Sequence, residues 1–127
     1  MSVRDAMSND VLTVGPSHTL REVSVAMRSR RVGAVVVVDP DGEGAGILTE
    51  RDVLIALADG GDPDVETVSE HLTSEIVYAS PGWGLEQAAE AMLRGGFRHL
   101  VVLEDGEVAG ILSVRDIVRR WHQDRVG

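Results

Sequence analysis

The sequence Gly46-Ile47-Leu48-Thr49-Glu50-Arg51-Asp52-Val53 decides the fold of this 127-residue chain, because it occurs twice. It returns as Gly110-Ile111-Leu112-Ser113-Val114-Arg115-Asp116-Ile117. In each copy a small residue and two aliphatic residues predict the end of a strand, and the residues after the hydroxyl predict the first turn of a helix. Two such strand–helix junctions in one short chain indicate an internal repeat.

The repeat extends over nearly the whole sequence. A constant offset of 65 residues relates positions before the turn that begins at Asp39, and an offset of 64 relates those after it, so one deleted turn residue explains the change. The matched pairs include Val3 and Val68, Pro16 and Pro81, Leu20 and Leu85, Ala26 and Ala91, Met27 and Met92, Val36 and Val101, and Val37 and Val102. We therefore expect two homologous halves, with Met27 and Met92 in their cores.

Each half has the same predicted order of elements. Thr19-Leu20-Arg21-Glu22 is a capping box that starts a helix. The apolar run Ala34–Val38 is rich in β-branched residues, which indicates a strand covered on both faces. In the first half we expect a helical turn at 2–7, a strand at 11–14, a helix from 19 to about 30–33, strands at 34–38 and 45–48 around a turn at 39–42, and a helix at 50–58 with Val53, Leu54 and Leu57 inward.

The second half repeats this order after an acidic linker. We expect a short helix at 67–72, strands at 76–79, 99–103 and 108–112, helices at 85–93 and 114–122, and turns at 81–84 and 104–106. The predicted fold class is α/β of the α+β type: two β-α-β-β-α repeats packed sheet to sheet with pseudo-twofold symmetry. The domain boundaries are a first repeat at 1–58, a linker at 59–66 and a second repeat at 67–127.

Composition excludes several classes of function. The chain has no cysteine, so disulfides and thiolate chemistry are ruled out, and all 12 basic residues are arginine. The formal net charge of −9 disfavours nucleic acid as a partner. No apolar segment is long enough to span a bilayer, and the first residues do not form a signal peptide, so we expect a cytoplasmic protein with no membrane contact.

These features resemble the cystathionine-β-synthase (CBS) domain, present as a tandem pair called a Bateman module. The resemblance covers residues 1 to about 122. It is carried by Asp5-Ala6-Met7-Ser8, Thr13-Val14-Gly15-Pro16 with Thr19-Leu20, residues 33–39, Phe97-Arg98-His99-Leu100-Val101-Val102, and the two Gly-Ile-Leu-(Thr/Ser)-x-Arg-Asp stretches. It implies a module that binds adenosine-containing ligands, among them AMP, ADP, ATP, S-adenosylmethionine and dinucleotides such as NAD, between the repeats.

The resemblance also implies crossed sites, in which the aspartate comes from one repeat and the other contacts come from its partner repeat. The aspartate would hold the ribose hydroxyls. The first cleft would contain Thr49 and Asp52, faced by residues 74–76 with Ile76, and by Arg98, His99 and Arg115. The second would contain Ser113 and Asp116, faced by residues 9–11 with Val11, and by Gly33, Ala34 and Arg51. Because Gly33 and Ala34 replace Arg98 and His99, we expect the Asp52 cleft to bind phosphate more strongly.

Other interpretations stay open for the same residues. A hydroxyl followed three residues later by an acid is also a helix N-cap. Arg51, Arg98, His99 and Arg115 are also compatible with solvated charges.

We expect no metal site, because His18, His71 and His122 share no metal-ligand spacing. We also expect no catalytic residues and no enzyme, because no nucleophile has a base beside it. Trp83 is predicted in an exposed turn, and Trp121 over the core end or in a subunit contact.

The sequence therefore predicts a non-catalytic regulatory module that needs no cofactor and binds an adenylate. Binding would change its conformation or rearrange a dimer, and so act on an unidentified regulated protein. The alternative is a homodimeric interaction scaffold with degenerate or empty ligand sites, which associates through the helices that close each repeat. Residues 54, 57, 118 and 121 are candidates for that surface.

Overall fold

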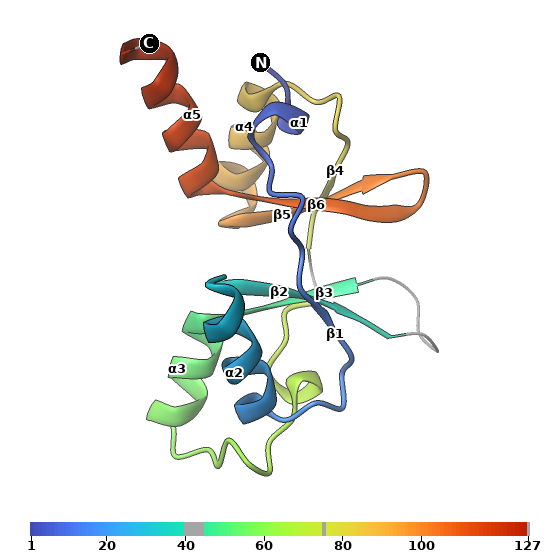
Figure 1. The fold of residues 1–127 in the computed structure, drawn as a ribbon, viewed down its shortest axis with the longest axis vertical. Helices are drawn as coiled ribbons and strands as arrows, with labels where there is room; N and C mark the ends of the chain where they lie inside the picture. Colours follow the sequence, from blue (N-terminus) through green and yellow to red (C-terminus); the bar gives the residue numbers. More distant parts are fainter. Residues whose placement is uncertain (40–44, 75, 127) are drawn as a thin grey trace. The chain divides into compact units, whose positions relative to one another are not determined.

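The computed structural model describes residues 1–39, 45–74 and 76–126, and it contains two compact units. The central unit is Leu12–Glu75, and the terminal unit combines Met1–Val11 with Ile76–Gly127. Each unit has one three-stranded sheet and helices (Figure 1), which confirms the mixed α+β class. The predicted turn at 39–42 falls largely on residues outside those described.

The central unit is built on the sheet β1-β2-β3. β1 (Thr13–Val14) runs parallel to β2 (Ala34–Val38), and β2 pairs antiparallel with β3 (Ala45–Thr49). α2 (Leu20–Arg30), α3 (Glu50–Ala58) and the 3₁₀ turn η1 (Val68–Glu70) complete the unit. Its core is formed by buried side chains of α2, β2, β3, α3 and η1, namely Leu20, Val23, Met27, Val35, Val37, Leu48, Ala56 and Val68.

The terminal unit repeats this plan with the sheet β4-β5-β6. β4 (Tyr78–Ala79) is parallel to β5 (His99–Glu104), which pairs antiparallel with β6 (Glu107–Ser113). The helices are α1 (Val3–Ala6), α4 (Leu85–Gly95) and α5 (Val114–Val126). Its core contains Val3, Ala79, Leu85, Ala88, Met92, Leu100, Val102 and Leu112. Asp105 and Gly106 both have positive φ, as a two-residue hairpin turn requires, so the turn predicted there is confirmed.

Most predicted elements are confirmed within a few residues. The Thr19 capping box forms as expected, since the Thr19 hydroxyl accepts from the N–H of Glu22 and the Glu22 carboxylate accepts from the N–H of Thr19. Met27 and Met92 are both buried in the cores. Val36 is as fully buried as Val35, although the two side chains lie on opposite faces of β2, in agreement with a strand covered on both sides.

The predicted inward face of α3 is wrong in two positions. Leu54 is 66% exposed and Leu57 is 45% exposed, whereas Ala56 is buried and Val53 packs against the core. Val53 and Ala56 are three residues apart and share one helix face, and each leucine follows one residue later, about 100° around the helix. Trp83 also differs from its prediction, since it is half-buried against the terminal core.

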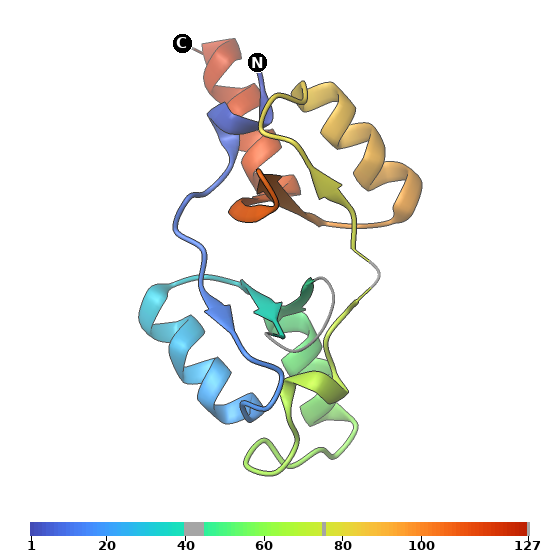
Figure 2. The ribbon, with the colours of Figure 1, turned by 90° about the vertical axis from the view of Figure 1, so that its right-hand side faces the viewer.

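The leading segment of each half packs in the unit built by the other half. Val3 of α1 lies in the core of the terminal unit, and Val68 of η1 lies in the core of the central unit. Figure 1 shows α1 beside α4 and α5, and Figure 2 shows the chain after α3 turning back to η1 beside α2 and α3. The two compact units therefore cut across the order of the sequence repeats.

Backbone pairs fix these exchanged segments to the last strand of each sheet. Ile47 and Thr73 exchange two N–H···O bonds of 2.9 Å. In the terminal unit, Ser8 N–H donates to the Ile111 carbonyl at 2.9 Å, and Ile111 N–H donates back at 3.1 Å. The strand glycines permit this close approach. A Cβ on Gly46 would lie 2.9 Å from the Thr73 carbonyl oxygen, and one on Gly110 would lie 2.7 Å from the Ser8 oxygen.

We expect Gly110→Ala to reduce the free energy of unfolding by about 1–3 kcal/mol, the usual cost of overpacking, because the new methyl group collides with backbone. Gly46→Ala should have a similar effect. The measurement is urea denaturation followed by circular dichroism. Gly82→Ala is the matched control, since the nearest atom to its Cβ would be the Ser80 Oγ at 3.9 Å. If Gly110→Ala and Gly82→Ala are equally stable, the close backbone contact between Ser8 and Ile111 does not require a glycine at position 110.

Candidate ligand-binding site

The strand–helix junction of the central unit holds the carboxylate of Asp52 in place. The Thr49 N–H and the Thr49 hydroxyl both donate to Asp52 Oδ2, at 2.9 and 3.0 Å. Thr49 Oγ1 accepts from the N–H of Asp52 at 3.2 Å. Thr49 is thus the N-cap of α3, and Asp52 is the acid of its capping box. Both bonds to the carboxylate use Oδ2, so Oδ1 is left for another donor within the described part of the chain.

The junction of the terminal unit has a similar geometry. The Ser113 N–H donates to Asp116 Oδ2 at 2.8 Å, and Ser113 Oγ accepts from the Asp116 N–H at 3.1 Å. Asp116 is mostly buried, with 15% of its side chain exposed, and its Oδ1 lies 3.5 Å from Nη1 of Arg119. Asp116 therefore differs from Asp52 in having a basic side chain of its own helix beside Oδ1.

The capping box alone does not distinguish these two junctions. Ser2 donates to Asp5 Oδ2 through its N–H and hydroxyl, and Thr19 donates to Glu22 in the same way. Those backbone bonds, aided by the hydroxyls, lower the pKa of Asp5 and of Glu22. Both acids are exposed, however, whereas Asp52 and Asp116 are partly buried at the end of a sheet strand. Partial burial strengthens a hydrogen bond to a ligand hydroxyl.

The central unit places three more predicted residues beside Thr49. Ala34 is the register partner of Thr49, and the Gly33 carbonyl accepts from the N–H of Glu50 at 2.9 Å. Arg51 lies in the first turn of α3 and is exposed. Residues 33, 34, 49, 51 and 52 are therefore brought together at one end of the central sheet.

The terminal unit places the corresponding basic residues beside Ser113. His99 is the register partner of Ser113, and the Arg98 carbonyl accepts from the N–H of Val114 at 2.9 Å. Arg98 and Arg115 are exposed and His99 is half-buried. The end of this sheet is consequently richer in basic side chains than the equivalent end of the central sheet, where Gly33 and Ala34 stand.

The two segments expected to face the adenine are residues 74–76 and 9–11, and residues 74–76 span the boundary between the units. The Ile47–Thr73 pair brings Ser74 to the sheet that carries Thr49 and Asp52. The Ser8–Ile111 pair brings Asn9 to the sheet that carries Ser113 and Asp116. Ile76 and Val11 both belong to the terminal unit. Within each unit the aspartate thus shares its sheet with one predicted adenine-facing segment.

The first predicted cleft draws on both units. Thr49 and Asp52 belong to the central unit, and Ile76, Arg98, His99 and Arg115 belong to the terminal unit. In the second predicted cleft, Ser113, Asp116 and Val11 belong to the terminal unit, and Gly33, Ala34 and Arg51 to the central unit. The crossed assignment of basic residues to aspartates stays a prediction.

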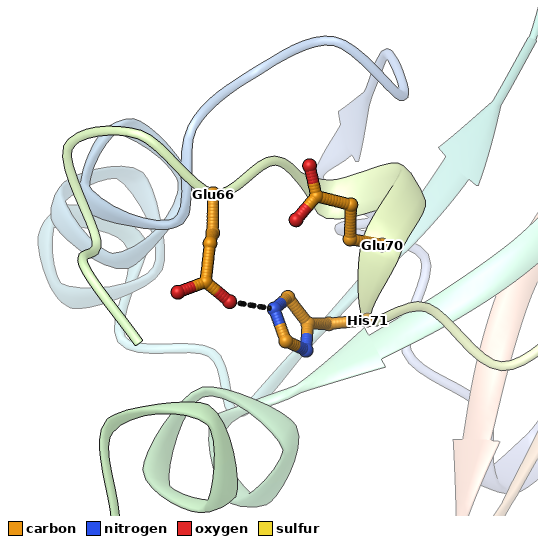
Figure 3. A group of neighbouring side chains, drawn as sticks. All are labelled: Glu66, Glu70 and His71. Atoms are coloured by element: carbon orange, nitrogen blue, oxygen red, sulfur yellow. Dashed lines mark hydrogen bonds and ion pairs between the residues drawn. The ribbon is translucent and has the colours of Figure 1, made fainter. Parts of the chain in front are cut away.

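One cluster of potential metal ligands was missed by the sequence reasoning. Glu66, Glu70 and His71 each offer a ligand atom, and these atoms lie within 4.8 Å of one another (Figure 3). His18, His71 and His122 share no metal-ligand spacing with one another. The signal that could have found the cluster is the spacing of two glutamates and one histidine across a short helical turn.

Comparison with protein families identifies the chain. The CBS domain model matches it twice, at residues 3–59 and 65–122. The chain belongs to the CBS domain family, as a tandem pair. CBS domain pairs are regulatory, ligand-binding modules that are typically non-catalytic.

Two curated relatives illustrate how this pair occurs. The CBS domain-containing protein YhcV of Bacillus subtilis is 33% identical over 116 residues, which cover 91% of this chain and 82% of YhcV. The uncharacterized protein MJ1225 of Methanocaldococcus jannaschii is 31% identical over 122 residues, which cover 96% of this chain. The chain spans only 43% of the length of MJ1225.

Solved structures share the fold. The CBS-domain containing protein ATU1752 from Agrobacterium tumefaciens is 36% identical with a TM-score of 0.84, and the match covers 95% of this chain and 99% of that one. The CBS domain pair of protein MJ0100, solved with 5′-methylthioadenosine and S-adenosyl-L-methionine, has a TM-score of 0.86 and covers 98% of each chain. At 23% identity, that second likeness shows the fold alone.

Among the helices of the described residues, none is long and apolar enough to cross a membrane.

Thr49→Ala should lower the free energy of unfolding by about 1 kcal/mol, because it removes the cap acceptor and leaves the Asp52 N–H without its side-chain partner. Guanidinium denaturation measures the loss. Ser29→Ala is the control, since Ser29 is exposed in α2 and alanine is the better helix former there. If Thr49→Ala is as stable as Ser29→Ala, the cap is not a stabilising feature of the junction.

Proposed function

We propose that this CBS pair is a regulatory module that binds an adenine nucleotide, of the AMP, ADP or ATP type, at the two strand–helix junctions. The observation that carries the proposal is the repeated, partly buried aspartate held by its own cap. Asp52 and Asp116 are each fixed through Oδ2, which orients the carboxylate before any ligand arrives. A fixed carboxylate suits the two hydroxyls of a ribose, because charge-assisted hydrogen bonds are the stronger class.

The phosphate would be held by local positive charge, since the chain as a whole is acidic. Arg98 and Arg115 supply that charge in the proposed Asp52 site, where the His99 ring can add a hydrogen bond, and Arg51 supplies it in the proposed Asp116 site. An arginine side chain offers a planar pair of donors to phosphate oxygens. The N-terminal N–H groups of α3 and α5 lie at the same junctions and also favour an anion.

Unequal sites follow from the same residues. Gly33 and Ala34 offer no charge where the other half has Arg98 and His99. Arg119 beside Asp116 competes in addition for the Oδ1 atom that a ribose hydroxyl would use. The Asp52 site is therefore proposed as the tighter phosphate-binding site. The MJ0100 pair shows that this fold can hold adenosine-containing ligands, and the residues above are what support the proposal for this chain.

A second candidate function is a homodimeric scaffold, and the closing helices favour it. Leu54, Ile55 and Leu57 are exposed on α3, as are Val118 and Trp121 on α5. In the terminal unit, α4, α5 and Met1 line an apolar groove of about 740 Å³. Such exposed apolar faces are typical of protein contacts. Ligand binding and dimerisation are compatible, and nucleotide would then change the affinity between copies.

The proposal predicts a rise in Tm of several degrees when AMP, ADP or ATP is present at about 100 times its Kd. Asp52→Asn should weaken the tighter site by tenfold or more, because it removes the charge from both ribose bonds. A thermal denaturation scan measures the rise in Tm, and calorimetric titration measures the loss of affinity. Glu22→Gln is the matched control, since it neutralises the acid of an exposed capping box that lies outside the proposed site.

The crossed arrangement has its own test in combined variants. Arg98→Ala should weaken the tighter site of Asp116→Asn protein, and it should leave the Asp116 site that remains measurable in Asp52→Asn protein unchanged. The opposite dependence would assign Arg98 to the Asp116 site of its own unit. If millimolar nucleotide does not change Tm, the ligand proposal is overturned and the homodimeric scaffold remains as the candidate function. Sedimentation velocity would then measure a dimer.

A further inference from the structure

We propose that Glu66, Glu70 and His71 form a binding site for a divalent transition-metal ion of the zinc type. All three residues come from one short segment of the central unit, around η1. Their ligand atoms lie within 4.8 Å of one another, and His71 Nε2 is 2.6 Å from Glu66 Oε1. Figure 3 shows the glutamates and the imidazole gathered on the same side of this segment.

The backbone that carries the three side chains is held in place without a metal. The N–H of Glu66 donates to the Asp62 carbonyl at 2.9 Å, and the Glu66 carbonyl accepts from Leu20 at 3.0 Å. Glu70 and His71 each donate to the carbonyl three residues earlier, at 3.1 and 3.0 Å. Val68, between them, is fully buried in the core. An ion would therefore bind to a scaffold that needs only side-chain adjustment.

A simple ion pair explains only part of this arrangement. His71 and Glu66 are the pair, and their side chains are 24% and 25% exposed. One carboxylate is enough to pair with one imidazole. The second carboxylate, Glu70, lies close to both and adds like-charge repulsion toward Glu66. A bound cation removes that repulsion and uses all three groups.

The donor set indicates which ions fit. One imidazole nitrogen with two carboxylate oxygens is a combination that zinc and its first-row neighbours accept, whereas magnesium and calcium prefer oxygen ligands throughout. On binding, the metal would take the place of the proton between His71 Nε2 and Glu66 Oε1. Three protein ligands would leave a coordination position for water.

The repeat supplies an internal comparison. The positions that correspond to Glu66, Glu70 and His71 in the other half are Met1, Asp5 and Ala6. That helical turn, α1, keeps one carboxylate and has no imidazole. We therefore expect one ion for each chain, bound by the central unit. The inference does not depend on nucleotide binding, because none of the three residues belongs to the proposed nucleotide sites.

The test uses the full chain, freed of metal with a chelator and titrated with zinc chloride in a calorimeter without nucleotide. Wild type should bind about one equivalent, and Tm should rise by several degrees at saturation. Glu70→Gln should weaken binding at least tenfold. It is the decisive variant, because glutamine keeps an oxygen to accept from the Thr67 hydroxyl and leaves the His71–Glu66 pair intact. His71→Gln should abolish the site.

His18→Gln is the matched control. His18 Nδ1 lies 3.5 Å from Glu22 Oε2 in the same unit, so this variant also removes a histidine–glutamate pair, but that pair does not belong to the three-ligand cluster. It should bind zinc as wild type does. The proposal is overturned if wild type shows no saturable binding, if Glu70→Gln binds unchanged, or if His18→Gln loses as much affinity as His71→Gln. Magnesium chloride at the same concentration should leave Tm unchanged.

Discussion

The structure depends on two close backbone contacts, in which a segment from one half pairs with the last strand of the sheet built by the other half. Ile47 pairs with Thr73, and Ser8 pairs with Ile111. Neither contact has room for a side chain on the neighbouring glycine, which is Gly46 in the central unit and Gly110 in the terminal unit. Each contact also holds a segment that contributes a buried valine to the core: Val68 in the central unit and Val3 in the terminal unit. Neither sequence repeat is therefore a complete structural unit by itself.

The same strands position the candidate ligand groups. β3 carries the backbone contact at Ile47 and ends at Thr49, which caps α3 and holds Asp52. The contact and the carboxylate are thus separated by only a few residues of rigid strand and helix. The recurrence of glycine and aspartate in one short motif has a physical reason, because the glycine admits the exchanged segment and the aspartate closes the cap.

Strand and helix positions could be predicted because they depend on local pattern. The β-branched run at 34–38 forms β2 with the same bounds, and the Thr19 capping box starts α2. The inward face of α3 was predicted less accurately, because residues 53–58 are all apolar and so lie on every side of the helix. Ala56, the smallest candidate, is the buried one, and Leu54 points outward. The face that carries Val53 and Ala56 is the one that packs against the core.

The sequence by itself determined the repeat, the order of the elements and the two capped aspartates, because these follow from local spacing and from the return of one motif. Only the tertiary structure decided which segments complete which core and which acids are partly buried, because both depend on contacts between residues far apart in the chain. The grouping of Glu66 and Glu70 with His71 was likewise decided by the structure. Glu66 precedes η1, Glu70 is its last residue and His71 follows it, and the fold of this segment brings their ligand atoms within 4.8 Å of one another.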